Sequence, residues 1–196
     1  MEAYPDKLEY QRNLALSHNN RGALLSHLGE MKEAQAAHLA AVDIQKQLVQ
    51  AAPAVVRHRS DLAISHNNLG MAYSKSDDPA KAEHSFVEAL RTLSALSAND
   101  TDNLLYRSSL GGSYNNLAMA LERLNRLDEA NGAYELAIEH QRAALESAPH
   151  EPRFRKFLDN HYQNYRRSLL AAGRYDDAAR IASDLEQLAS DSPSQQ

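Results

Sequence analysis

The chain of 196 residues repeats itself with a period of 48 residues. Its clearest segment occurs four times in fixed register, as Ser17-His18-Asn19-Asn20, Ser65-His66-Asn67-Asn68, Ser113-Tyr114-Asn115-Asn116 and His161-Tyr162-Gln163-Asn164. Leucine and alanine columns keep the same register, at Leu14, Leu62, Leu110 and Leu158 and at Ala34, Ala82, Ala130 and Ala178. Self-similarity at a fixed period of this kind indicates a repeat architecture. Four copies fill nearly the whole chain, so no room remains for a separate catalytic domain.

The amino-acid composition restricts each repeat to helices. The sequence holds 32 Ala and 27 Leu, but only 11 residues of Val, Ile and Thr together. β-Branched residues are the ones that pack well on a pleated sheet, whereas Ala and Leu have favourable helix propensities. We therefore predict an all-α protein and exclude α/β folds, sandwiches and barrels.

Each unit contains two long helical stretches separated by a short break. Pro5, Pro53 and Pro149 mark unit starts, where proline is tolerated in the first helical turn. We predict first helices at 5–28, 53–75, 101–124 and 150–172 and second helices at 30–51, 77–98, 125–148 and 173–190. The predicted organisation is a single array over residues 1–190, with repeats at 5–52, 53–100, 101–148 and 149–190 and a flexible tail at 191–196.

The second unit resembles the tetratricopeptide repeat (TPR) family. Its small and large residues follow the TPR pattern at Leu69, Gly70, Tyr73, Ala82, Phe86 and Ala89. The family unit has about 34 residues, so these units are longer. They look like the kinesin-light-chain type of TPR and like the arrays attached to bacterial serine/threonine protein kinases. The resemblance implies a right-handed α-solenoid of four helix-turn-helix repeats, whose first helices line a concave groove, in the interaction region of a larger, kinase-linked protein.

The charges follow the alternation of first and second helices. The predicted first helices hold 13 Lys/Arg and 7 Asp/Glu, whereas the second helices hold 8 Lys/Arg and 16 Asp/Glu, within a net charge of −5. With the groove placement that the resemblance implies, this pattern predicts a basic groove that attracts an extended acidic peptide or partner segment. The alternative is that the opposite charges neutralise one another between neighbouring helices.

Two adjacent columns of carboxamides are the candidate peptide-binding residues. The columns are Asn19, Asn67, Asn115 and Gln163, and Asn20, Asn68, Asn116 and Asn164. Asn disfavours helix interiors, and neighbouring helix positions point about 100° apart, so the columns cannot face the same way. The resemblance implies that one column holds a peptide backbone, and the other, or both, could instead fix the register of the repeats. Helical phase adds Arg12, Lys156, Arg167, Met71 and Met119 to the first column's face.

Other classes of function find little support in the sequence. There is no Cys, and the nine His form no metal-binding or catalytic spacing, so we predict no metal, no cofactor and no enzyme. The sequence lacks a membrane-spanning run and a signal peptide, and we expect a cytoplasmic protein. Two alternatives to peptide binding stay open. One is a regulatory or self-associating homo-oligomeric array, and the less favoured one binds single-stranded nucleic acid.

Overall fold

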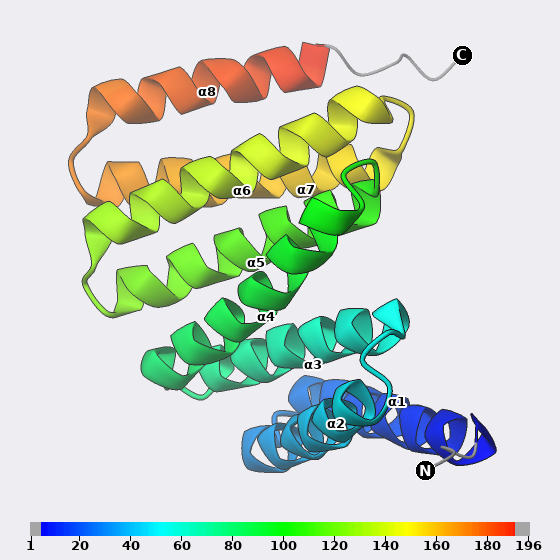
Figure 1. Cartoon of the computed structure of the whole chain (residues 1–196). Helices are drawn as coiled ribbons and strands as arrows, with labels where there is room; N and C mark the ends of the chain where they lie inside the picture. Colours follow the sequence, from blue (N-terminus) through cyan, green and yellow to red (C-terminus); the bar gives the residue numbers. More distant parts are fainter. Residues whose placement is uncertain (1–4, 191–196) are drawn as a thin grey trace. The chain divides into compact units, whose positions relative to one another are not determined.

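The computed structural model describes residues 5–190, and this part of the chain forms eight α-helices (Figure 1). The helices are α1 (Pro5–Leu28), α2 (Met31–Ala51), α3 (Val56–Lys75), α4 (Pro79–Asn99), α5 (Leu104–Arg123), α6 (Leu127–Ser147), α7 (Pro152–Ala171) and α8 (Tyr175–Ser190). The prediction of an all-α fold built from helix pairs is confirmed. The tail predicted at 191–196 lies outside the described residues.

The turns inside the four helix pairs all use the same position of the repeat. Residues Gly29, Asp77, Asn125 and Gly173 have positive φ, between 58° and 83°. Gly adopts this left-handed conformation freely, and Asn and Asp tolerate it better than other residues. The next N–H then donates to a carbonyl in the last turn of the first helix, for example from Arg126 to Leu121 over 2.9 Å. This hydrogen bond is that of the Schellman motif, which ends the helix.

Two of the junctions between pairs differ from the prediction at their prolines. We predicted that the helices begin at Pro53 and directly after Pro149, but α3 begins at Val56 and α7 at Pro152. Each proline is the second residue of a tight turn, which is closed by hydrogen bonds from Val55 N–H to the Ala52 carbonyl and from Glu151 N–H to the Ala148 carbonyl. Proline is favoured at the second position of such turns because its φ is already fixed near the required value.

The chain forms two compact units, which we describe separately. Unit 1, Met1–Asp100, contains α1–α4, and unit 2, Thr101–Gln196, contains α5–α8. In unit 1, α2 packs on both α1 and α3, and α4 packs on α3. The same order recurs in unit 2, where α6 packs on α5 and α7, and α8 packs on α7. Each unit therefore holds two of the predicted repeats.

Small residues in the repeat register lie where helices approach most closely. Ala34, Ala82, Ala130 and Ala178 are all at most 2% exposed. A Cβ atom on Gly70 would lie 2.5 Å from the ring of Phe86, and one on Gly22 would lie 2.7 Å from the ring of His38. At Gly22 and Gly70 the helices therefore approach closely, and larger side chains fill the space opposite them.

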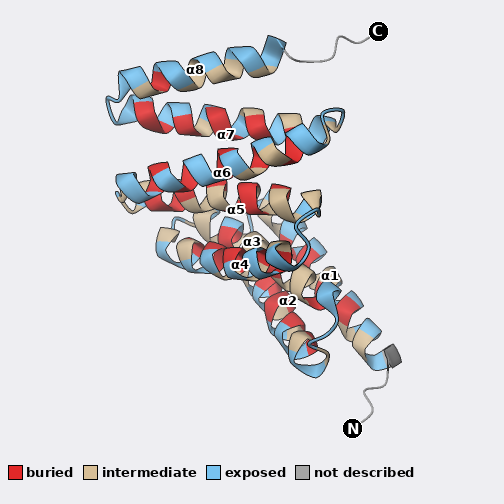
Figure 2. Cartoon of the chain, turned by 45° about the horizontal axis from the view of Figure 1, so that its top comes forward, coloured by how far each residue is buried: buried red, intermediate tan, exposed pale blue. Residues whose placement is uncertain are grey.

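Burial is uneven along unit 2. Buried positions recur along α5, α6 and α7, whereas α8 carries few (Figure 2). Ala178 is the one buried residue among those described in α8, and Ile181, Leu185 and Leu188 stay partly exposed against the core of unit 2. The last helix of this unit therefore retains apolar surface that the unit itself does not cover.

Candidate functional site

A groove in unit 2 brings together five of the candidate residues. It lies between α5 and α7 and has a volume of about 390 Å³. Its lining consists of Gly112, Asn115, Asn116 and Met119 on α5 and of Phe157, Asn160, His161, Gln163 and Asn164 on α7. None of these side chains is an acid, a lysine or an arginine, and five of the nine are carboxamides. We refer to this site as the carboxamide groove.

The carboxamides of the groove divide into bonded and available groups. Asn164 Nδ2 donates to Asn115 Oδ1 over 3.1 Å, and Asn115 Nδ2 lies 3.7 Å from the Met119 sulfur. This bond ties α7 to α5. By contrast, the side chains of Asn116 and Asn160 form no hydrogen bond with any of residues 5–190. Each of these two retains a free donor and a free acceptor, one on either wall of the groove.

The remaining lining supplies apolar surface and one further carboxamide. Phe157 is 43% exposed and Met119 is 36% exposed. A large aromatic ring and a flexible thioether can both pack on varied partners. Gln163 Nε2 already donates to Asp159 over 2.6 Å. The groove therefore combines exposed apolar surface with two uncommitted carboxamides.

Sequence reasoning missed three lining residues of α7, namely Phe157, Asn160 and His161. The sequence prediction assumed that residues 48 apart line the same groove. The lining face of the last first helix was therefore taken to be the face that contains Gln163. Across neighbouring first helices the structure instead pairs residues 49 apart, as in Asn115 with Asn164 and Arg12 with Asp61. Two helices that flank a groove present opposite sides to it, so adjacent columns meet. Phase taken from Asn164 would have found Phe157 and Asn160, which lie seven and four positions earlier.

His161 lies in the lining of the groove and has no polar partner. Its side chain is 4% exposed, and neither ring nitrogen forms a hydrogen bond with the described residues. Burial lowers the pKa of His161 to about 4, because the charged imidazolium would lose its hydration. The residue is therefore neutral at pH 7.

We expect the titration of His161 to make unit 2 sensitive to acid. An unfolded His binds a proton near pH 6.5, while the folded residue resists it until about pH 4. Stability is therefore complete above pH 6.5 and falls as the pH drops toward 4, by at most about 1.4 kcal/mol per pH unit from this residue. Urea unfolding of His161→Leu should show a shallower fall between pH 6.5 and 4 than the wild type. Parallel pH profiles would contradict this assignment.

In unit 1, Asn19 belongs to a buried network that joins three helices. Its Nδ2 donates to Ser65 Oγ of α3 over 2.6 Å, and its Oδ1 lies 3.0 Å from His38 Nδ1 of α2. Ser65 Oγ in turn donates to Gln45 Oε1 of α2. All four residues are at most 6% exposed. The carboxamide of Asn19 is thus fully used inside unit 1.

The other candidates of unit 1 lie in different surroundings. Arg12 is 8% exposed, and its Nε lies 2.7 Å from Asp61 Oδ2 of α3, so its charge is paired inside the unit. Asn20 is exposed, Asn67 and Asn68 are half-buried, and Met71 is 42% exposed. In the first repeat, Asn20 is therefore accessible while Asn19 is buried. In the second repeat, Asn67 and Asn68 are both half-buried.

The two basic candidates of α7 do not line the carboxamide groove. Lys156 borders a separate hollow with Asp159 and Leu188, and Arg167 is exposed outside the groove lining. Even so, α7 carries five Lys/Arg and one Asp, while α6 carries five Asp/Glu and one Arg. In unit 1 the second helices α2 and α4 each hold two acids and two bases. The predicted charge alternation is therefore concentrated in unit 2.

Neither a metal centre nor a membrane span emerges from the described residues. No three His, Asp or Glu side chains within residues 5–190 are grouped so that they could hold a metal ion. Likewise, no helix in this range has the length and the apolar composition to cross a bilayer.

The paired helices and their repeated turns define an all-α helical-repeat protein. Two segments of the sequence, residues 63–92 and 110–151, match models of the tetratricopeptide repeat. These two segments of the chain are therefore tetratricopeptide repeats. A comparison with curated protein sequences found no match.

One solved structure supports this fold. BtubC (BKLC) from P. vanneervenii matches with a TM-score of 0.69 at 19% identity, over 90% of this chain and 63% of that one. The present chain thus spans less than two thirds of that structure, and the likeness at this identity concerns the fold alone. Kinesin-light-chain TPR-like repeats from Podosopora anserina (15% identity, 96% and 97% coverage, TM-score 0.39) and MamA AMB-1 (15%, 92% and 94%, 0.40) are less similar and support no argument.

Proposed function

We propose that the chain binds an extended peptide segment of a partner protein in the carboxamide groove of unit 2. The observation that carries the proposal is the pair Asn116 and Asn160, which are uncommitted and lie on opposite walls of the groove. A carboxamide both donates and accepts, so it can pair with the N–H and C=O of an extended backbone whatever the side chains are. The bonded pair Asn115–Asn164 holds the two walls together.

The side chains beside these carboxamides favour a peptide that also carries apolar residues. Met119 and Phe157 are both partly exposed in the lining. Because apolar area removed from water contributes roughly 25 cal/mol per Å², covering these two residues adds affinity that the backbone contacts alone lack. No covalent chemistry and no cofactor is part of this proposal.

An acidic peptide is the preferred ligand because of the charge on α7. The groove lining itself carries no formal charge, but α7 contributes five Lys/Arg against one Asp. Such a local excess attracts an acidic segment at long range and is screened by salt. A cytoplasmic location is proposed with it, since the chain contains no Cys.

A peptide selection tests the proposal. A random linear-peptide library is selected against the full chain, and enriched peptides are measured by calorimetry. Asn116→Ala combined with Asn160→Ala should weaken binding about tenfold or more, since each lost pair of hydrogen bonds costs roughly 1 kcal/mol. Gln47→Ala, an exposed carboxamide change on α2, should leave the affinity unchanged. Raising the salt concentration should weaken acidic peptides selectively.

Each alternative gives a different result in these measurements. No enriched peptide, or equal affinities of the variant and the wild type, would reject the groove as the binding site. A molar mass that doubles with concentration in light scattering, without peptide binding, would favour the self-associating array. Oligonucleotide binding that depends on Asn116 and Asn160 would favour single-stranded nucleic acid as the ligand instead.

A further inference from the structure

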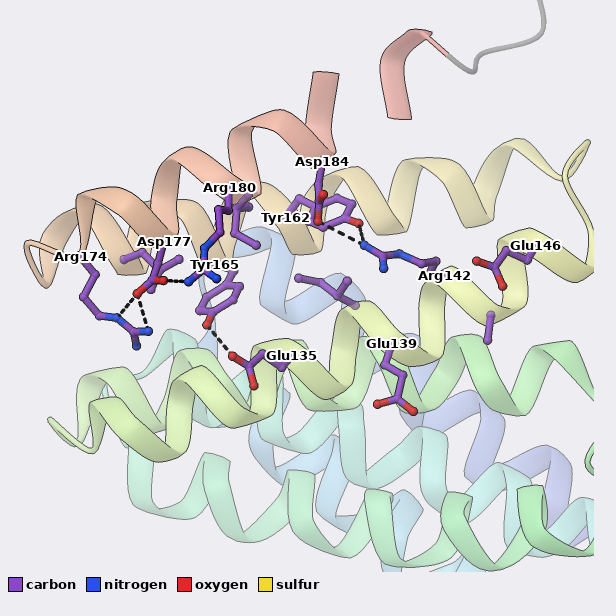
Figure 3. Close-up of a pocket in the computed structure, with 14 residues that line it drawn as sticks. Glu135, Glu139, Arg142, Glu146, Tyr162, Tyr165, Arg174, Asp177, Arg180 and Asp184 are labelled. Atoms are coloured by element: carbon purple, nitrogen blue, oxygen red, sulfur yellow. Dashed lines mark hydrogen bonds and ion pairs between the residues drawn. The ribbon is translucent and has the colours of Figure 1, made fainter. Parts of the chain in front are cut away.

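Unit 2 contains a second hollow that is distinct from the carboxamide groove (Figure 3). Its volume is about 590 Å³, and its floor is formed by Tyr162, Tyr165 and Leu169 of α7. The walls are α6 and α8, which both pack on α7 but, within the described part of the unit, not on each other. An adjoining hollow of about 520 Å³ shares Arg142, Glu146, Tyr162 and Asp184 with it and continues past the end of α6. These two hollows together are named the α6–α8 cleft.

The cleft follows the length of its two walls. Its lining residues run along α6 from Glu135 to the following Pro149, and along α8 from Asp177 to Leu188, at positions that share one face of each helix. At 1.5 Å per residue, the α6 wall is about 20 Å long. An α-helix of about four turns has the same length.

The cleft already holds a guanidinium group. Arg142 donates to the Tyr162 hydroxyl and, over 3.2 Å, to Asp184 Oδ2 of α8 (Figure 3). Its Cζ also lies 5.8 Å from the centroid of the Tyr162 ring. A tyrosine face beside a carboxylate is a favourable environment for a cation. This contact spans from α6 to α8 where the two hollows meet, so an occupant that follows both hollows lies on the solvent side of it.

The two wall helices carry more acid than base, although the lining of the cleft also includes Arg155 of α7 and Arg174. α6 and α8 hold nine Asp/Glu and two Arg between them. Arg174 and Arg180 at one end are both bonded to Asp177. Glu139 and Glu146, which also line the cleft, accept no hydrogen bond and form no ion pair with any described residue. They lie seven positions apart, and so on the same face of α6.

Apolar surface completes the cleft. Ile181 and Leu188 of α8 line it and remain partly exposed, since Ala178 alone is buried among the described residues of that helix. An occupant with an apolar stripe would cover Ile181 and Leu188, while cations on its flanks would face Glu139 and Glu146.

We propose that the α6–α8 cleft is a second binding site, which accepts one basic amphipathic helix of a partner protein. The apolar stripe of that helix packs on Ile181 and Leu188, and its Lys or Arg side chains pair with Glu139 and Glu146. The site lies on different helix faces from the carboxamide groove, so one chain can hold an extended segment and a helix at separate places.

A synthetic peptide tests this site. The probe is an amphipathic helix with a Leu stripe flanked by Lys, and its control has the same composition in scrambled order. Titration of the full chain should give saturable one-to-one binding of the probe, about tenfold tighter than the scrambled peptide. Glu139→Lys combined with Glu146→Lys should weaken the probe about tenfold or more through charge repulsion. Hydrogen exchange of α8 amides should slow when the probe binds.

Matched variants distinguish binding in the cleft from non-specific charge attraction. Glu186→Lys also replaces an acid by a lysine, but at an exposed position of α8 outside the cleft lining. This variant should bind the probe like the wild type. The groove variant Asn116→Ala/Asn160→Ala should also bind it normally. Equal binding of the scrambled peptide, or equal loss in Glu186→Lys, would overturn the proposal. Concentration-dependent dimerisation that Glu139→Lys/Glu146→Lys abolishes would assign the cleft to a second copy instead.

Discussion

Replacing Asn19 with Ala should destabilise unit 1 by about 2–3 kcal/mol. The change leaves the buried Ser65 hydroxyl without its donor and the His38 Nδ1 without its partner, and it opens a small cavity between three helices. A buried polar group left unpaired costs roughly 1–3 kcal/mol, which outweighs the better helix propensity of Ala. Urea or thermal unfolding measures the loss directly.

The neighbouring residue provides the control. The side chain of Asn20 is exposed and forms no hydrogen bond with the described residues, so Asn20→Ala should change stability by about 0.5 kcal/mol or less. A double-mutant cycle with Ser65→Ala should show that the two buried changes are not additive, since they remove one shared bond. Equal melting of Asn19→Ala and Asn20→Ala would refute the buried network.

Gly70→Ala should destabilise unit 1 by about 1–2 kcal/mol, although Ala is the better helix former. The new Cβ would lie 2.5 Å from the ring of Phe86, which is 1% exposed and has no space to move aside. Overpacking of this kind costs about 1–3 kcal/mol, and the gain in helix propensity offsets up to about 1 kcal/mol of it. Chemical denaturation at neutral pH is the measurement.

The same substitution elsewhere should have the opposite sign. A Cβ on Gly112 of α5 would meet no neighbouring atom within 4 Å. Gly112→Ala should therefore stabilise the protein by about 0.5–1 kcal/mol, because the unfolded chain loses conformational freedom. If Gly70→Ala also raised the unfolding midpoint, the close contact between α3 and Phe86 would not exist as described.

Much of the fold follows from local chemistry, and for that reason could be predicted. Ala and Leu excess selects helices, and the residues at 29, 77, 125 and 173 are Gly, Asp, Asn and Gly, which accept the left-handed turn found there. The alanines at 34, 82, 130 and 178 recur in register because each helix pair needs the same close approach. The predicted starts of α3 and α7 were too early. Proline fits the first turn of a helix as well as a tight turn that precedes the helix, so the sequence alone does not distinguish the two.

The candidate site was predicted only in part. The carboxamide columns did identify Asn115, Asn116, Gln163 and Asn164 of the groove, together with Met119. The α6–α8 cleft was not anticipated, because its walls are separate stretches of acidic helix and its floor is a third helix with ordinary core residues. The residue patterns of α6 and α8 do not predict that both helices pack on α7 while their backbones remain apart from each other.

The sequence by itself determined the period, the helices, their turns and the small residues at which they touch, since each depends on residues close together in the chain. Only the tertiary structure decided that Asn19 and Asn115 are buried while Asn20 and Asn116 are more accessible. Helical periodicity states which positions share a face, but not which side of that face a neighbouring helix covers. Because helices beside a groove present opposite sides to it, Asn115 meets Asn164 rather than Gln163, and Asn116 and Asn160 remain available to a ligand.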